Sequence, residues 1–252
     1  MNGLETEREA LTRTARRLAE RGHVVAAGGN LSLRVRVKPP KQDPALAILG
    51  AAVPGLAGAM FLATRSGARL ETLDAGRDLV LVHVLPDGDR IEVWSDVDAP
   101  PTIEIDSHLA IHAALVARRI DSLVVAHAHP RAVVALTHVD ELRGEAAFNR
   151  ALRGAHPESA VHLAPGLGWV DYRLSGRPAI ARLSAEAVVR GRLGAVWDRH
   201  GVIVHGRTPL EVADRIDLLD FAAGVRLSAL ATGRPVTGLS DDQVDEARAA
   251  YA

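Results

Sequence analysis

Apolar and polar positions alternate in several short segments of the chain, and this pattern predicts β-strands that bury one face. The clearest alternation is LSLRVRV at 31–37. The residues PDGD at 86–89 are typical of a turn and predict a hairpin between two such segments. Strands are predicted at 31–37, 60–64, 78–84, 90–94, 166–172, 194–197 and 202–204. Residues 38–60 lack the alternation, so we expect a loop insertion there.

A helical spacing of apolar residues appears first at 5–21, where Leu4, Leu11, Ala15 and Leu18 fall on one side. Further helices are predicted at 102–119, 131–139, 145–154, 184–192 and 209–231. Because no stretch between these elements resembles a linker, we expect one domain over 1–252 with a C-terminal tail at 239–252.

Two histidines in the sequence SLVVAHAHP end one predicted strand. On a strand, residues i and i+2 point to the same side, so His127 and His129 present two imidazoles together. Pro130 then ends the strand and suits the first turn of the next helix. The pair is suited to a transition-metal ion, although two histidines can also alternate by chance.

The amino-acid composition limits the binding partners and metal ligands that we expect. The net charge of −1 gives no electrostatic reason to expect nucleic acid or an anionic membrane surface as a partner. There is no cysteine, so any metal would be held by histidine and carboxylates. The first 21 residues are charged, and the longest apolar run, 45–63, is interrupted by Pro54. We therefore expect a cytoplasmic protein that binds no membrane.

The chain has two lysines, Lys38 and Lys41, and both lie in the proline-rich segment VKPPKQDP. A lysine that forms an imine needs a desolvated pocket that lowers its pKa. A loop with three prolines is a poor place for such a pocket, so we do not expect lysine-imine chemistry.

Further candidates lie on other predicted elements. Glu104 and His108 are four residues apart at the start of a helix and share one face. Glu104 is either an acid/base beside a metal with His108 as its partner, or a residue that complements the helix dipole. His200 precedes Gly201 and could supply a third imidazole.

Two short loops, 28–32 and 64–67, have the glycines and small polar residues that bind anions through backbone N–H groups. Thr102, at a predicted helix start, could add a contact. Each loop could equally be an ordinary turn.

Taken in order, the motifs GGNLS, SG after a strand, PTIExxxH, HAHP and HG resemble the class II aldolase/adducin family. The resemblance covers residues 8–232 and is greatest to the rhamnulose-1-phosphate aldolases. It implies a three-layer αβα sandwich with a mostly antiparallel central sheet, assembled as a homotetramer. It also implies metal-dependent cleavage of a ketose 1-phosphate to dihydroxyacetone phosphate and an aldehyde.

The resemblance also assigns roles to residues. It implies Zn²⁺ held by His127, His129 and His200, with Glu104 as the acid/base and an enediolate stabilised by the metal. Glu158 falls near a second family carboxylate that enters the site from a neighbouring subunit. The residues implied to bind the substrate phosphate are Gly29, Asn30, Ser66, Gly67 and Thr102.

Two positions depart from the family pattern. Ala27 replaces an asparagine and Ile103 replaces a serine, and each lost hydrogen bond to a phosphate is worth about 1.5–3 kcal/mol. A weaker phosphate site, or a substrate without phosphate, therefore stays open. So do a sugar-phosphate dehydratase and a 4-epimerase, although glutamate at position 104 disfavours the epimerase. A non-enzymatic adducin-like assembly module is a further alternative.

Overall fold

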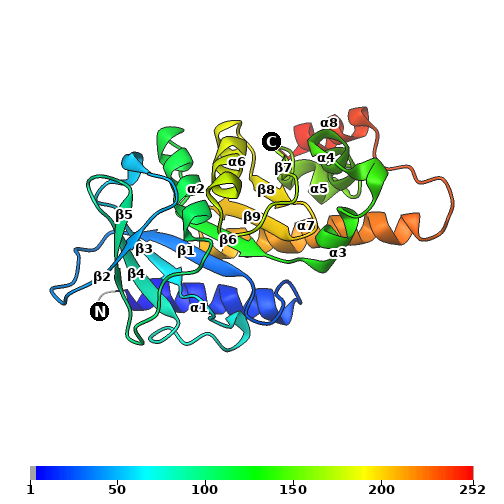
Figure 1. Ribbon diagram of the computed structural model, residues 1–252. Helices are drawn as coiled ribbons and strands as arrows, with labels where there is room; N and C mark the ends of the chain where they lie inside the picture. The colour runs from blue at the N-terminus through cyan, green and yellow to red at the C-terminus, as the bar shows by residue number, and fades with distance from the viewer. Residues whose placement is uncertain (1–3, 252) are drawn as a thin grey trace.

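The computed structural model describes residues 4–251 and builds them around one open sheet (Figure 1). Among these residues the sheet has nine strands in the order β2-β5-β4-β3-β1-β6-β9-β8-β7. Neighbouring strands are antiparallel except β7 and β8, which are parallel. The strands are β1 Asn30–Val35, β2 Ala45–Ile48, β3 Met60–Thr64, β4 Leu79–Val84, β5 Arg90–Trp94, β6 Val124–Ala128, β7 Gly168–Val170, β8 Gly194–Trp197 and β9 Gly201–Gly206.

Helices cover both faces of the sheet, so the predicted three-layer fold is confirmed. Helices α2 and α6 pack on one face, whereas α1 and α7 pack on the other (Figure 1). The α-helices are α1 Glu5–Glu20, α2 Ile105–Ala117, α3 Arg131–Leu136, α4 Glu145–Arg153, α5 Pro157–His162, α6 Pro178–Val189, α7 Pro209–Leu230 and α8 Asp241–Ala250. Helices α4, α5 and α8 lie together beyond the β7 end of the sheet (Figure 1).

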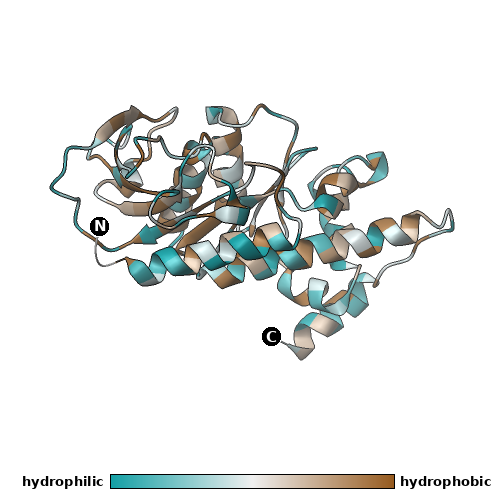
Figure 2. Ribbon diagram, turned by 90° about the horizontal axis from the view of Figure 1, so that it is seen from below, coloured by the Kyte–Doolittle hydropathy of each residue, from teal (hydrophilic) through white to brown (hydrophobic). Residues whose placement is uncertain are grey.

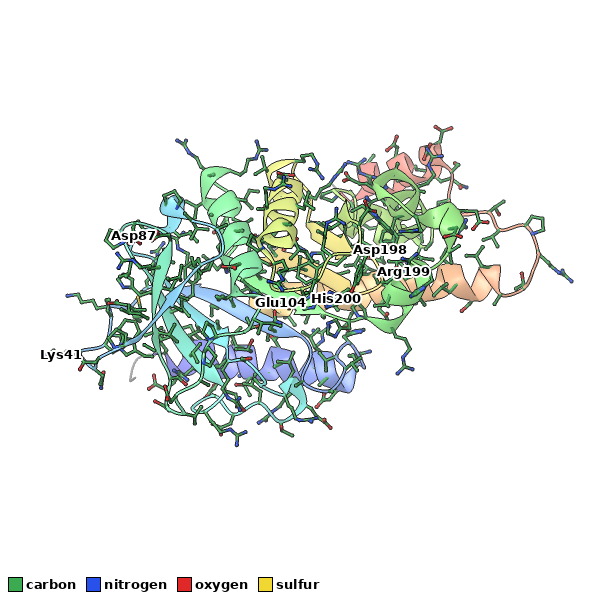
Figure 3. The ribbon with its side chains drawn as sticks, viewed as in Figure 1. Lys41, Asp87, Glu104, Asp198, Arg199 and His200 are labelled. Atoms are coloured by element: carbon green, nitrogen blue, oxygen red, sulfur yellow. The ribbon has the colours of Figure 1, made fainter. Side chains whose placement is uncertain are left out.

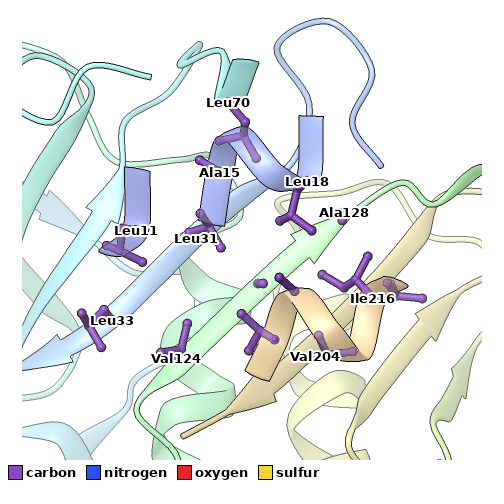
Figure 4. Packing of buried hydrophobic residues seen from close by; sticks show 14 of the residues in the cluster. Leu11, Ala15, Leu18, Leu31, Leu33, Leu70, Val124, Ala128, Val204 and Ile216 are labelled. Atoms are coloured by element: carbon purple, nitrogen blue, oxygen red, sulfur yellow. The ribbon is translucent and has the colours of Figure 1, made fainter. Parts of the chain in front are cut away.

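The periodic leucines of α1 form part of the core, as the sequence predicts. Leu11, Ala15 and Leu18 are fully buried and pack with residues of β1, β6 and α7 (Figure 4). Truncating one of these leucines to alanine typically costs about 2–5 kcal/mol. The layer of α1 and α7 therefore packs directly against β6, the strand that carries His127.

The outer surface of this layer is mixed, because Leu210 and Phe221 of α7 are exposed among polar residues. Seen from below, α1 and α7 carry many hydrophilic residues on their exposed sides (Figure 2). None of the helices built from residues 4–251 has the length and apolar character needed to cross a membrane.

Several predicted boundaries are wrong. The expected loop insertion at 38–60 contains strand β2 and a 3₁₀ helix, η1 (Pro54–Leu56). Strand β2 is at the edge of the sheet, where Leu46 and Ile48 are 66% and 83% exposed, so burial imposes no alternation on its sequence. The expected tail 239–252 contains α8, which starts with a capping box between Ser240 and Gln243.

Candidate metal centre and active site

The central strand β6 delivers His127 to the site. His127 lies opposite Asn30 of β1 and, like Val125, faces the layer of α2 and α6. Its Nδ1 is 2.9 Å from the carbonyl oxygen of Val202, and since a carbonyl can only accept, Nδ1 carries the proton. The Nε2 lone pair is then free to bind a metal, in the tautomer that such a hydrogen bond selects.

The three predicted metal ligands are brought together. One nitrogen of each of His127, His129 and His200 lies within 4.8 Å of the others, and the Nε2 atoms of His127 and His129 are 2.9 Å apart. Burial lowers the pKa of His127 well below its usual value, and the neighbouring imidazoles add to this effect. Burial, with His200 nearby, also lowers the pKa of His129 to about 4. Three neutral imidazoles are a donor set that fits Zn²⁺ or a similar divalent ion.

Glycines create the space that the His129 ring occupies. A Cβ on Gly28 would lie 2.5 Å from Cε1 of His129. A Cβ on Gly201 would lie 3.0 Å from the Cδ2 of the same ring and 2.3 Å from the carbonyl oxygen of Ala128. Side chains at either position would therefore displace the ring or the strand beneath it.

The turn that carries His200 is held from outside the sheet. It joins β8 to β9, and Arg199 adopts the left-handed conformation (φ 57°) that is costly for a residue with a side chain. The N–H of Arg199 donates to Oγ1 of Thr137 at 3.0 Å. The buried carboxylate of Asp198 accepts from Arg143 at 2.7 Å. These two contacts hold the turn that carries His200 in place. Figure 3 labels Asp198, Arg199 and His200 in this turn.

Glu104 lies beside the histidines. It is the residue before α2, and its side chain accepts no hydrogen bond from a backbone N–H group at the start of that helix. Its Oε2 is 3.5 Å from Nε2 of His127, and its Oε1 is 3.9 Å from Nε2 of His200. Burial raises the pKa of Glu104, while hydrogen bonds from Asn30 and Ser175 oppose the shift.

A buried chain of hydrogen bonds orients this carboxylate. Asn30 donates its Nδ2 to Glu104 Oε2 at 2.7 Å and accepts at Oδ1 from Nε2 of His108 at 2.6 Å. Nδ1 of His108 is in turn 2.8 Å from the hydroxyl of Ser32. His108 therefore acts on Glu104 through Asn30 rather than by direct contact.

The predicted anion loops meet in a cavity next to Glu104. Its volume is about 260 Å³. All five predicted phosphate-binding residues line it, together with Ala27, Ile103, Glu104, Ser175 and the three histidines. The loop after β3 is braced by Arg65, which pairs with Asp78 at 2.7 Å and donates to the carbonyl of Ser66 at 2.9 Å. Ile103 is 65% exposed, so it leaves an apolar side chain at the mouth of the cavity.

Glu158 is not brought to this site within one chain. It lies on α5, exposed, with His162 at 3.2 Å, and does not line the cavity. The lysines are also remote: Lys41 lies at the β2 end of the molecule (Figure 3), and Lys38 lines a different cavity. Sequence reasoning missed Ser175, because the loop at 171–177 that places it near Glu104 has no recognisable pattern.

Comparison with known proteins agrees with this geometry. The family model described as the class II aldolase and adducin N-terminal domain matches residues 9–227. The chain belongs to this family. Its match therefore covers every candidate site residue named above.

Several curated relatives carry the name rhamnulose-1-phosphate aldolase. The protein of that name from Bacteroides thetaiotaomicron is 23% identical over 269 residues, covering 100% of this chain and 98% of the relative. Another, from Enterococcus faecalis, is 30% identical over 190 residues, covering 74% of this chain and 67% of the relative.

Solved structures share the fold. The sugar-phosphate aldolase from Thermotoga maritima is 28% identical with a TM-score of 0.79, covering 93% of this chain and 98% of that one. An L-fuculose 1-phosphate aldolase is 20% identical with a TM-score of 0.68, covering 98% of this chain and 96% of that one, and this likeness concerns the fold alone.

Proposed function

We propose that this class II aldolase is a zinc-dependent lyase that cleaves a ketose 1-phosphate into dihydroxyacetone phosphate and an aldehyde. The observation that carries the proposal is the carboxylate of Glu104 lying 3.5 Å from the nearest nitrogen of the three-histidine cluster. The names of the curated relatives support the substrate class. We expect a cytoplasmic homotetramer.

His127, His129 and His200 would hold the metal, because their nitrogens converge and burial keeps the rings neutral. When bound, a divalent cation supplies Lewis-acid stabilisation of negative charge on the substrate oxygens. We assign phosphate binding to Gly29, Ser66, Gly67 and Thr102, whose loops line the adjacent cavity. Asn30 lines the same cavity and we assign it to phosphate binding as well, in addition to the hydrogen bond by which it orients Glu104.

In cleavage, the bond between C3 and C4 breaks and its electron pair stays on C3. The proton of the C4 hydroxyl leaves, so that its oxygen becomes the aldehyde carbonyl. Glu104 delivers a proton to C3 and completes dihydroxyacetone phosphate, a role that its burial and raised pKa suit. We propose that Glu158 from a neighbouring copy accepts the proton of the C4 hydroxyl.

A screen of ketose 1-phosphates, with dihydroxyacetone phosphate detected by a coupled dehydrogenase, tests the function. We expect release of dihydroxyacetone phosphate that depends on added Zn²⁺. Loss of water or inversion at C4, without cleavage, would favour the dehydratase or the epimerase. No conversion by metal-loaded protein would favour the adducin-like assembly module.

The role of Glu158 has its own test. Glu104→Gln and Glu158→Gln should each be inactive, whereas subunits mixed after dissociation should regain about a quarter of the wild-type activity, because some sites combine two intact carboxylates. No recovery from reassembled mixed tetramers would contradict a shared site.

A further inference from the structure

A second cavity adjoins the histidine cluster. Its volume is about 590 Å³. His129 and His200 line both this cavity and the smaller one that contains Glu104. A substrate held at the cluster by its central oxygens would therefore extend into both cavities, one at each end.

Two arginines stand among the polar residues that line the second cavity. Arg131, His138 and Arg199 line it, and no aspartate or glutamate does. Within residues 4–251, no ion pair joins Arg131 to a carboxylate. Arg199 has Asp198 at 3.7 Å, but that carboxylate already accepts from Arg143 at the shorter distance of 2.7 Å. Both guanidinium groups thus keep donors for a ligand.

The remaining wall is apolar and comes from Val24, Val25, Val134 and Ala135. Such a wall suits a short carbon chain, which it would bury without requiring hydrogen bonds. The backbone of Arg199 is strained and hydrogen-bonded to Thr137. This contact sets the position of the Arg199 Cα atom, from which one of the two arginine side chains extends.

We propose that this cavity binds an acidic group, a carboxylate or a phosphate, at the far end of the aldehyde half of the substrate. The inference rests on the proposed aldolase function and names the substrate class more closely. Paired arginines recognise either anion through charge-assisted hydrogen bonds. The carbon chain between the reacting carbonyl and the acidic group would lie along the valines.

The condensation direction tests this with zinc-loaded protein and dihydroxyacetone phosphate. The aldehydes are succinic semialdehyde (carboxylate), glyceraldehyde 3-phosphate (phosphate) and lactaldehyde (neutral). We expect wild-type kcat/KM to be at least tenfold higher for one of the acidic aldehydes than for lactaldehyde. The acidic aldehyde that is preferred identifies the anion.

Variants separate recognition from general damage. Arg131→Gln and Arg199→Gln should each lower kcat/KM for the preferred acidic aldehyde about 10- to 100-fold, the range for one charge-assisted hydrogen bond. In Arg131→Gln, kcat/KM for lactaldehyde should change less than twofold. Arg118→Gln, at an exposed arginine outside the cavity, is the matched control and should change neither.

Two failures are distinguishable. If lactaldehyde is condensed best and neither cavity variant alters the preference, the aldolase function stands and the acidic subsite is overturned. If no aldehyde is condensed at all, the proposed aldolase function is wrong, and the acidic subsite, which depends on it, is wrong as well.

Discussion

Replacing Gly28 by alanine should weaken metal binding while leaving the fold intact. The backbone of Gly28 lies outside the left-handed region, so alanine can adopt it. The added Cβ, however, would lie 2.5 Å from Cε1 of His129, whereas ordinary contact begins at 3.4 Å. The carbonyl oxygen of Val25, at 2.9 Å, prevents the methyl group from moving aside.

The ring of His129 must therefore retreat by about 0.9 Å, several times the roughly 0.2 Å by which metal–ligand distances vary. Mispositioning one ligand in this way typically costs 10- to 100-fold in metal affinity, or about 1.4–2.7 kcal/mol.

The assay is competition for Zn²⁺ between the metal-free protein and a chromophoric chelator, with thermal unfolding of the metal-free protein measured in parallel. Gly55→Ala is the matched control, because a Cβ at Gly55 meets nothing within 4 Å. We expect Gly28→Ala to bind Zn²⁺ at least tenfold more weakly than Gly55→Ala, with similar unfolding temperatures. Equal affinity in the two variants would refute the assignment of His129 as a ligand.

Other substitutions test other parts of the site. Glu104→Gln should keep metal and fold but lower kcat by about 10²–10⁴; a smaller loss would reject Glu104 as the acid/base. Thr137→Val removes the acceptor for the Arg199 N–H and should weaken Zn²⁺ binding about tenfold or more in the chelator assay, and unchanged affinity would show that this contact does not position the turn. Ile103→Ser should lower KM for ketose 1-phosphates about tenfold or more with little change in kcat; no gain would indicate a substrate without phosphate. Burial lowers the pKa of His205 to about 4, so its stabilising contribution is complete above about pH 6.5 and is lost as pH falls towards 4. Urea unfolding of wild type and His205→Leu should accordingly show a weaker pH dependence in the variant, and parallel curves would contradict the shift.

Much of the metal centre could be predicted from the sequence because its signals are local. The alternation around His127 and His129 predicts that both side chains point to the same side of one strand. Pro130 marks the end of that strand. The position of His200 beside them depends on the pairing of β6 with β9, which spacing alone does not reveal. The ordered set of family motifs supplied that long-range information.

Other features depend on contacts that leave no periodic signal. The side chain of Asn30 bridges Glu104 and His108, and no sequence motif indicates this contact. Ser175 reaches Glu104 from a loop without a pattern. The edge strand β2 is not predicted from the sequence, because an exposed strand does not require alternating apolar and polar residues.

The metal dependence of carbon–carbon bond cleavage tests the central claim most directly. Protein produced with zinc available should contain one divalent ion per chain and release dihydroxyacetone phosphate from a ketose 1-phosphate. Exhaustive chelation should abolish this release and added Zn²⁺ should restore it, whereas His127→Ala should neither retain the ion nor regain activity. Undiminished cleavage by the metal-free protein would contradict the account.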